Sequence, residues 1–127
     1  MSKICIVEDD AQIRVMLKET LELEGFAIVE AANGNEALRV LDAEAVDLVI
    51  TDILMPEKEG LGLITELRKL HPGLAIFAIS GGAPHMQAAG NLELATLFGA
   101  RQAFRKPIDL DELIAAVKDC LDAPDAG

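Results

Sequence analysis

Two hydrophobic periodicities alternate along the chain, and this alternation constrains the fold more than any other feature. Short aliphatic runs are separated by segments in which apolar residues recur every third or fourth position, the spacing of one helix face. The runs lie at residues 3–7, 26–31, 47–52 and 74–80, and a shorter fifth strand is predicted at 101–106. Strands that are apolar throughout are typical of a sheet covered on both faces. The sequence therefore predicts an α/β domain with five parallel strands, right-handed crossovers and helices on both sides.

The intervening segments predict five helices, each with an apolar stripe facing the sheet. The predicted inward residues are Ile13, Met16, Leu17 and Leu21 in the first helix; Ala37, Leu38 and Leu41 in the second; Leu61, Ile64, Leu67 and Leu70 in the third; Leu94, Leu97 and Phe98 in the fourth; and Leu110, Leu113, Ile114, Val117 and Leu121 in the fifth. Gly25 is expected to end the first helix, and Asp109 with Glu112 has the spacing of a capping box. We expect one domain over residues 1–122 and a disordered tail over residues 123–127.

Composition limits both the core and the partners. The 127 residues suffice for one domain, and 51% of them are hydrophobic without any Trp or Tyr, so the core must be built from Leu, Ile, Val and Ala. The 22 acidic and 11 basic residues give a net charge of -11, which argues against direct binding of nucleic acid and favours protein partners and cations. Cys5 and Cys120 fall in apolar segments and are expected to pack in the core. Without a signal peptide or an apolar run of membrane-spanning length, we expect a cytoplasmic protein with no membrane partner.

Polar residues stand at the ends of four of the five predicted strands. They are Asp9 and Asp10 after the first strand, Asp52 at the end of the third, Ser80 at the end of the fourth and Lys106 at the end of the fifth. The carboxyl ends of parallel strands share one edge of the sheet, which is where such folds bind ligands. We therefore expect these five side chains to converge on one pocket.

The chemistry of this set points to phosphoryl transfer. Carboxylates that lie close together repel one another unless their pKa values rise or a cation binds. Oxygen ligands without nearby His or Cys favour a hard ion, and Mg²⁺ commonly takes one or two carboxylates together with water and phosphate. A carboxylate can also act as a nucleophile and form an aspartyl phosphate, whose charge Mg²⁺ and a lysine would offset. Asp52 is the predicted acceptor because it lies centrally, with the Asp9 and Asp10 pair beside it.

Four short motifs in this order resemble the receiver domain of two-component response regulators. They are "EDD" at residues 8–10, "DILMP" at 52–56, "IS" at 79–80 and "RKP" at 105–107. The resemblance covers nearly the whole chain and implies a flavodoxin-like (βα)5 doubly wound parallel sheet with strand order 2-1-3-4-5. It also implies that Asp52 accepts a phosphoryl group from a histidine kinase or a histidine phosphotransfer protein.

The same resemblance implies a role for each remaining site residue. Asp9 and Asp10 would hold Mg²⁺ with Asp52 and the backbone carbonyl of Leu54. Lys106 would pair with the phosphoryl oxygens, and the Ser80 hydroxyl would move to hydrogen-bond one of them. Pro107 resembles the family's cis-proline, which would support the orientation of the lysine.

The sequence departs from the family pattern at two places. The family's aromatic switch is missing, because Ala103 stands at its position; Phe104 is next along the strand and should face the core. We therefore expect the signal to pass through movement of the loop after Ser80, which contains Gly81, Gly82 and Gly90. Leu54 and Gly82 offer no polar group to orient a water molecule, so we expect slow hydrolysis of the aspartyl phosphate.

Several alternatives to this interpretation stay open. Asp10 could cap the first helix instead of binding a metal, and Ser80 before two glycines could simply turn the chain. A phosphohydrolase with an aspartyl nucleophile is disfavoured, because Leu54 stands where such an enzyme would carry its general acid. A degenerate receiver that no longer takes phosphate is favoured only by Ala103.

We therefore predict a stand-alone receiver that is a signalling protein and not an enzyme. Its partners would be a histidine kinase or phosphotransfer protein and a downstream protein target, with no direct contact to nucleic acid. The target would bind around the fourth helix, fifth strand and fifth helix. The protein would be a monomer or a dimer formed on phosphorylation.

Overall fold

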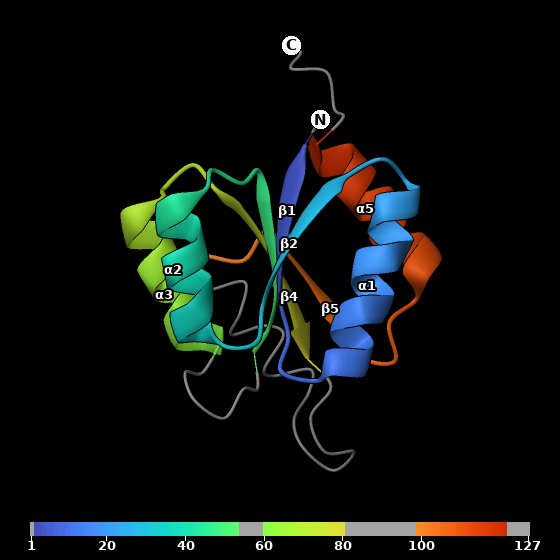
Figure 1. Cartoon of the computed structure of the whole chain (residues 1–127), viewed down its shortest axis with the longest axis horizontal. Coiled ribbons are helices and arrows are strands. Elements are labelled where there is room, and N and C mark those ends of the chain that lie inside the picture. The colour runs from blue at the N-terminus through green and yellow to red at the C-terminus, as the bar shows by residue number, and fades with distance from the viewer. Residues whose placement is uncertain (1, 54–59, 81–98, 122–127) are drawn as a thin grey trace.

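The computed structural model describes residues 2–53, 60–80 and 99–121 and contains a five-stranded parallel sheet (Figure 1). The strands are β1 (Lys3–Val7), β2 (Ala27–Ala31), β3 (Leu48–Asp52), β4 (Ala75–Ser80) and β5 (Gln102–Arg105), and the helices are α1 (Ala11–Leu23), α2 (Gly34–Ala43), α3 (Gly60–Leu70) and α5 (Leu110–Leu121). The sheet order is β2-β1-β3-β4-β5, which confirms the predicted flavodoxin-like topology. The fourth predicted helix, with Leu94, Leu97 and Phe98, lies outside the described residues.

Helices cover both faces of the sheet, so two apolar clusters form. Helices α2 and α3 lie on one face, while α1 and α5 lie on the other (Figure 1). Leu41 and Leu63 belong to the first cluster, and Leu17 and Leu113 belong to the second. Because both faces are covered, every residue of the central strand β3 is buried. In the part of the chain that the structure describes, no helix is both long and apolar enough to cross a membrane.

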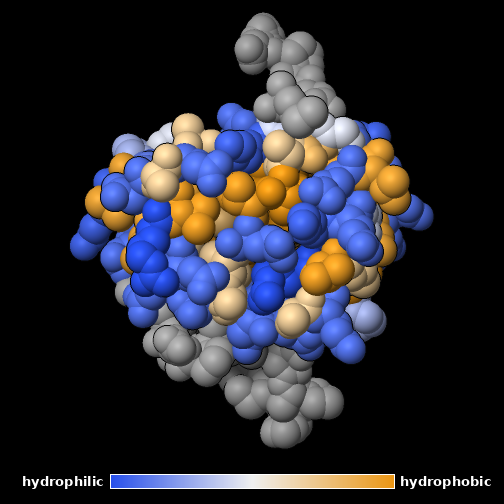
Figure 2. Space-filling view, viewed as in Figure 1, coloured by the Kyte–Doolittle hydropathy of each residue, from blue (hydrophilic) through white to orange (hydrophobic). Residues whose placement is uncertain are grey.

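The edge strand β2 is less covered than the central strands. Among the strands that the structure describes, it pairs with β1 alone, and its residues 27–30 are half-buried. Figure 2 shows an apolar band over this strand, bordered by hydrophilic side chains of the neighbouring helices. A five-residue edge strand that carries the charged residue Glu30 offers a poor template for further strand pairing.

Helix termini follow the predicted capping signals. Gly25 directly follows Glu24, the C-cap of α1, and has φ +98, a conformation that glycine adopts without steric cost. At the start of α5, the backbone N–H of Glu112 donates to Asp109 Oδ1 at 3.1 Å, which confirms one of the two bonds of a capping box. Asn33 caps α2 by accepting a hydrogen bond from the Glu36 backbone N–H.

Two residues predicted to face the core are exposed instead. Met16 is 39% exposed because the buried stripe of α1 runs through Leu17 and Leu21, and Met16 lies on its flank. Leu70 is 61% exposed because it is the last residue of α3. The sequence interpretation also missed Leu63, which is fully buried in α3. The other stripe predictions are confirmed as buried or half-buried wherever the side chains are described; Leu61 falls outside them.

The strand register aligns the carboxyl ends at one edge. Val7 pairs with Thr51 and Asp52 pairs with Ile79, while Ser80 pairs with Arg105. The residues that follow these positions therefore meet at the same edge of the sheet, as expected for parallel strands.

Candidate functional site

Three charged side chains converge where β1, β3 and β5 end. Glu8 directly follows β1, Asp52 is the last residue of β3, and Lys106 directly follows β5. The Lys106 Nζ atom donates to Asp52 Oδ2 at 2.9 Å and lies 3.1 Å from Glu8 Oε1. Glu8 is 1% exposed and Asp52 is 4% exposed, so one ammonium group lies between two buried carboxylates.

Asp9 completes a group of three carboxylates with Glu8 and Asp52. One carboxylate oxygen from each residue lies within 4.8 Å of the other two. Asp9 is exposed, so solvent reaches the group from its side. Glu8 Oε1 is buried and has no hydrogen-bond partner counted among the described residues, although it forms an ion pair with Lys106 Nζ at 3.1 Å. A buried oxygen without a hydrogen bond and an all-oxygen donor set fit a hard divalent cation.

The Asp10 side chain contacts the first turn of α1. Its Oδ1 atom accepts hydrogen bonds from the backbone N–H groups of Gln12 at 2.9 Å and Ile13 at 3.3 Å, so Asp10 is the N-cap of α1. Among the described residues, the carboxylate group consists of Glu8, Asp9 and Asp52 and does not include Asp10. The helix-cap alternative is thus confirmed, while a metal-binding role for Asp10 stays a prediction.

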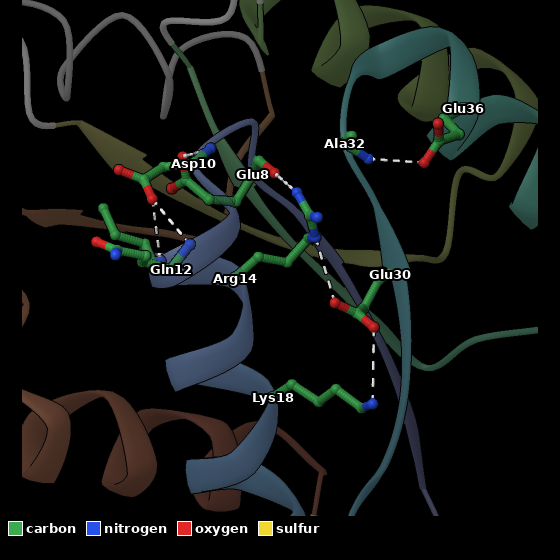
Figure 3. Close-up of polar contacts among 9 residues, drawn as sticks. Glu8, Asp10, Gln12, Arg14, Lys18, Glu30, Ala32 and Glu36 are labelled. Carbon is green, nitrogen blue, oxygen red and sulfur yellow. Dashed lines mark hydrogen bonds and ion pairs between the residues drawn. The ribbon is translucent and has the colours of Figure 1, made fainter.

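Glu8 is the site residue that the sequence interpretation missed. The only signal for it was its place at the start of the "EDD" motif, directly after the aliphatic run. Its backbone N–H donates to the Ala31 carbonyl at 3.0 Å, which extends the strand pairing by one residue. Its Oε2 atom accepts a hydrogen bond from the Asp10 backbone N–H at 3.1 Å (Figure 3). The side chain is therefore held inside the site and does not extend into solvent.

The electrostatics of the site follow from this burial. Burial raises the pKa of the Glu8 carboxyl to about 7, and the negative charge of Asp52 adds to the rise, which outweighs the opposing effect of Lys106. Burial alone would lower the pKa of Lys106, but its contacts with Asp52 and Glu8 raise it above its ordinary value. The lysine therefore stays charged, while Glu8 can exchange its proton near neutral pH.

Four further predicted residues have different outcomes. Ser80 ends β4 at the edge that carries the carboxylates, and its side chain falls outside the described part of the structure, as does Leu54. The peptide bond between Lys106 and Pro107 is cis, as predicted. Ala103 is half-buried and packs against the α2 and α3 side of the sheet.

The aromatic residue beside Ala103 faces the core. The Phe104 ring is 6% exposed, and its centroid lies 5.5 Å from that of Phe77 on β4. This confirms that Phe104 points away from Ala103 and belongs to the core under α1 and α5. The glycines predicted to make the loop after Ser80 pliable lie outside the described residues.

A hollow in the described surface lies away from these charged side chains. It has a volume of about 550 Å³ and is lined by the α2–β3 and α3–β4 connections, which include Asp42, Asp47 and His71. These connections lead into the amino ends of their strands, at the opposite edge from Asp52. This hollow is therefore separate from the edge where the charged side chains converge.

Comparison with known proteins gives a consistent match over nearly the whole chain. A family model described as the response regulator receiver domain matches residues 4–118. The transcriptional regulatory protein CpxR of Klebsiella pneumoniae is 37% identical over 121 residues, which cover 95% of this chain and 50% of CpxR. The chain thus spans about half the length of this relative.

Solved structures match with similar coverage. A response regulator receiver domain protein from Clostridium thermocellum superposes with a TM-score of 0.88 at 28% identity, covering 99% of this chain and 98% of the other. The response regulator TrrA of Thermotoga maritima, solved in complex with Mg²⁺-BeF, superposes with a TM-score of 0.82 at 36% identity. The match covers 95% of this chain and 100% of the TrrA chain.

Proposed function

This chain belongs to the response regulator receiver family of two-component signal transduction, and from that premise we propose that Asp52 is its phosphoacceptor. One observation carries the proposal. Asp52 is buried at the end of the central strand, within hydrogen-bonding distance of Lys106 and grouped with the carboxylates of Glu8 and Asp9. An Asp with only a structural role would not need two further acids and a lysine around it.

The proposed reaction is transfer from a phosphohistidine of a histidine kinase or phosphotransfer protein. An oxygen of the Asp52 carboxylate attacks phosphorus and forms a P–O bond, while the P–N bond breaks and its electron pair returns to the donor imidazole. The Lys106 ammonium lies 2.9 Å from Asp52 Oδ2, so it can follow the negative charge onto the phosphoryl oxygens. The protein contributes position and charge, which are the main requirements of phosphoryl transfer.

We further propose that Glu8, Asp9 and Asp52 hold Mg²⁺. When bound, the ion would supply charge neutralisation for the oxygens of the transferred group. The three carboxylate oxygens are close enough to share one cation, and the neighbouring structure of TrrA was solved with Mg²⁺-BeF. The Leu54 carbonyl as a further ligand stays part of this proposal and is not described by the structure.

The output is proposed to be a change in a protein-binding surface. Ser80 ends β4 beside Arg105 of β5, so a movement of the segment after Ser80 would alter the surface next to β5 and α5. Ala103 provides no aromatic ring for this coupling, which leaves the backbone after Ser80 to transmit it. We also propose that this surface binds a downstream protein target, and that the receiver is stand-alone, either as a monomer or as a dimer formed on phosphorylation.

Intact mass spectrometry tests the proposal directly. The protein is incubated with acetyl phosphate and Mg²⁺ as wild type, as Asp52→Asn and as Asp42→Asn, which changes an exposed acid on α2. We expect the mass of one phosphoryl group to be added to the wild type and to Asp42→Asn, and none to Asp52→Asn. Mg²⁺ binding without any added mass in the wild type would refute the phosphoacceptor role and favour the degenerate receiver. Rapid, continuous release of inorganic phosphate would favour the phosphohydrolase.

A further inference from the structure

The turn between β1 and α1 carries two of the three clustered carboxylates, Glu8 and Asp9. Strand pairing fixes only the start of this turn. Among the described residues, the last backbone hydrogen bond between this turn and the sheet runs from the Glu8 N–H to the Ala31 carbonyl. Beyond it, the repulsion among three neighbouring carboxylates favours any motion that separates them. Lys106 offsets part of this repulsion at the Glu8 and Asp52 side chains, and a group that holds the backbone of the turn would oppose the motion further.

Arg14, in the first turns of α1, reaches back to this segment (Figure 3). Its Nη1 atom donates to the Glu8 carbonyl at 2.7 Å, and its Nε atom donates to Glu30 Oε1 at 3.2 Å. Glu30 lies on β2, and its other oxygen lies 3.7 Å from Lys18 Nζ. One guanidinium thus connects the turn, the edge strand and α1.

The geometry suits a fixed support better than an ordinary surface ion pair. The side chain of Arg14 is 19% exposed and that of Glu30 is 33% exposed, so both are partly withdrawn from solvent. The planar guanidinium can donate to a carbonyl and to a carboxylate at the same time, which a lysine ammonium does with less geometric definition. The short bond to the carbonyl is charge-assisted and is correspondingly strong.

We propose that Arg14 is a positioning residue for the acidic site, and that Glu30 orients it. By holding the Glu8 carbonyl, Arg14 fixes the turn so that the carboxylates of Glu8 and Asp9 face Asp52 despite their mutual repulsion. Arg14 itself touches neither the metal nor the phosphoryl group in this scheme. The inference rests on the proposed function, because it assigns Arg14 a role in Mg²⁺ binding at that same site.

The test compares Arg14→Met, Glu30→Gln and the control Lys118→Met. Arg14→Met keeps the length of the apolar stem and removes both hydrogen bonds. Lys118→Met removes a 2.7 Å ion pair to Glu24, which lies at the opposite end of α1 from the site. Mg²⁺ affinity is measured by calorimetry, and hydrogen exchange of the Asp10 amide is measured by NMR without Mg²⁺. The free energy of unfolding in urea is measured for each variant.

We expect Arg14→Met to weaken Mg²⁺ binding about tenfold, as the loss of an outer-shell support commonly does. The Asp10 amide should exchange faster, because its bond to Glu8 Oε2 depends on the same turn. Glu30→Gln should change both quantities in the same direction by a smaller factor, and it carries the test if Arg14→Met does not fold. Lys118→Met should leave both quantities unchanged.

Two results separate the failure of this inference from the failure of the proposed function. If the wild type binds Mg²⁺ and Arg14→Met binds it equally well while losing only stability, the positioning role is overturned. If the wild type itself does not bind Mg²⁺, the proposed metal site fails, and the Asp10 exchange rate decides the positioning role alone. Unchanged exchange in Arg14→Met would then overturn it.

Discussion

Replacing Glu8 by Gln should stabilise the protein above neutral pH when Mg²⁺ is absent. Gln has nearly the shape of the protonated glutamic acid and cannot ionise. In the wild type, the Glu8 carboxyl lies in a buried position beside Asp52, and its pKa is raised from the ordinary 4.5 to about 7. The folded protein therefore holds the Glu8 proton more tightly than the unfolded chain does.

The sign and the size of the effect follow from this difference. Below about pH 4.5 the residue is protonated in both states, and the stabilisation that the proton provides is fully present. As the pH rises through about 7, the folded state loses the proton, and that contribution disappears. The rise in pKa corresponds to up to roughly 3 kcal/mol of unfolding free energy. The Glu8→Gln variant should not lose this unfolding free energy, because Gln does not ionise. The difference in unfolding free energy between the variant and the wild type should therefore grow between about pH 5 and pH 8.

Urea unfolding followed by far-UV circular dichroism measures the difference, since the chain has no Trp or Tyr for fluorescence. Both proteins are compared at each pH in a chelator, so that the titration of other residues cancels. Asp42→Asn, an exposed change on α2, serves as the control and should show no such trend. A difference between Glu8→Gln and wild type that stays constant across this pH range would refute the reasoning. Saturating Mg²⁺ should reverse the order, because only the wild type keeps all three carboxylates.

Three further predictions concern single positions. Asp10→Ala should lower the unfolding free energy by about 1 kcal/mol through loss of the helix cap, and should change Mg²⁺ affinity in calorimetry far less than Asp9→Asn does. Gly99→Ala should lower the unfolding free energy in urea more than Gly25→Ala does. Both glycines have positive φ, which costs an alanine roughly 1–2 kcal/mol. A Cβ at Gly99 would also lie 2.6 Å from the Arg68 Cγ atom, whereas a Cβ at Gly25 would have no atom within 4 Å. Lys106→Met should slow phosphorylation by acetyl phosphate at least about tenfold, measured by the rate of mass gain, because the transferred charge loses its ammonium partner. Equal rates for Lys106→Met and wild type would contradict that role.

The fold could be predicted from the sequence because the apolar pattern encodes it directly. Runs that are apolar throughout lie on buried parallel strands, and the stripes through Leu17, Leu41 and Leu113 face the sheet. The errors at Met16 and Leu70 share a cause. A repeat of three or four residues locates the buried face of a helix only to within about one residue on either side. Met16 on the flank of α1 and Leu70 in the last turn of α3 were therefore assigned to the core. Only the packing against the sheet decides such borderline positions.

The acidic site could be predicted only to within one residue, for a physical reason. Side chains of an ordinary half-buried strand alternate between apolar and polar, and this fixes which face each following residue takes. Residues 4–7 of β1 are all buried, so the alternation is absent, and the sequence does not tell whether "EDD" places Glu8 with Asp9 or Asp9 with Asp10 in the site. Asp10 is also a good helix cap, and both assignments satisfy the local rules. In the structure, Asp10 accepts a hydrogen bond at the start of α1, and Glu8 forms an ion pair with Lys106.

The charges at the site explain why this arrangement calls for a divalent cation. Three carboxylates and one ammonium leave two negative charges in a mostly buried place. Without metal, the structure offsets part of this excess by raising the pKa of Glu8 to about 7, so that a proton is bound for part of the time near neutral pH. A divalent ion removes the remaining excess and displaces that proton, so Mg²⁺ binding should release protons and should weaken as the pH falls below about 7. A monovalent ion would leave one charge uncompensated. Calorimetry in two buffers of different ionisation enthalpy measures the protons released, and a value of zero at neutral pH would contradict the participation of Glu8.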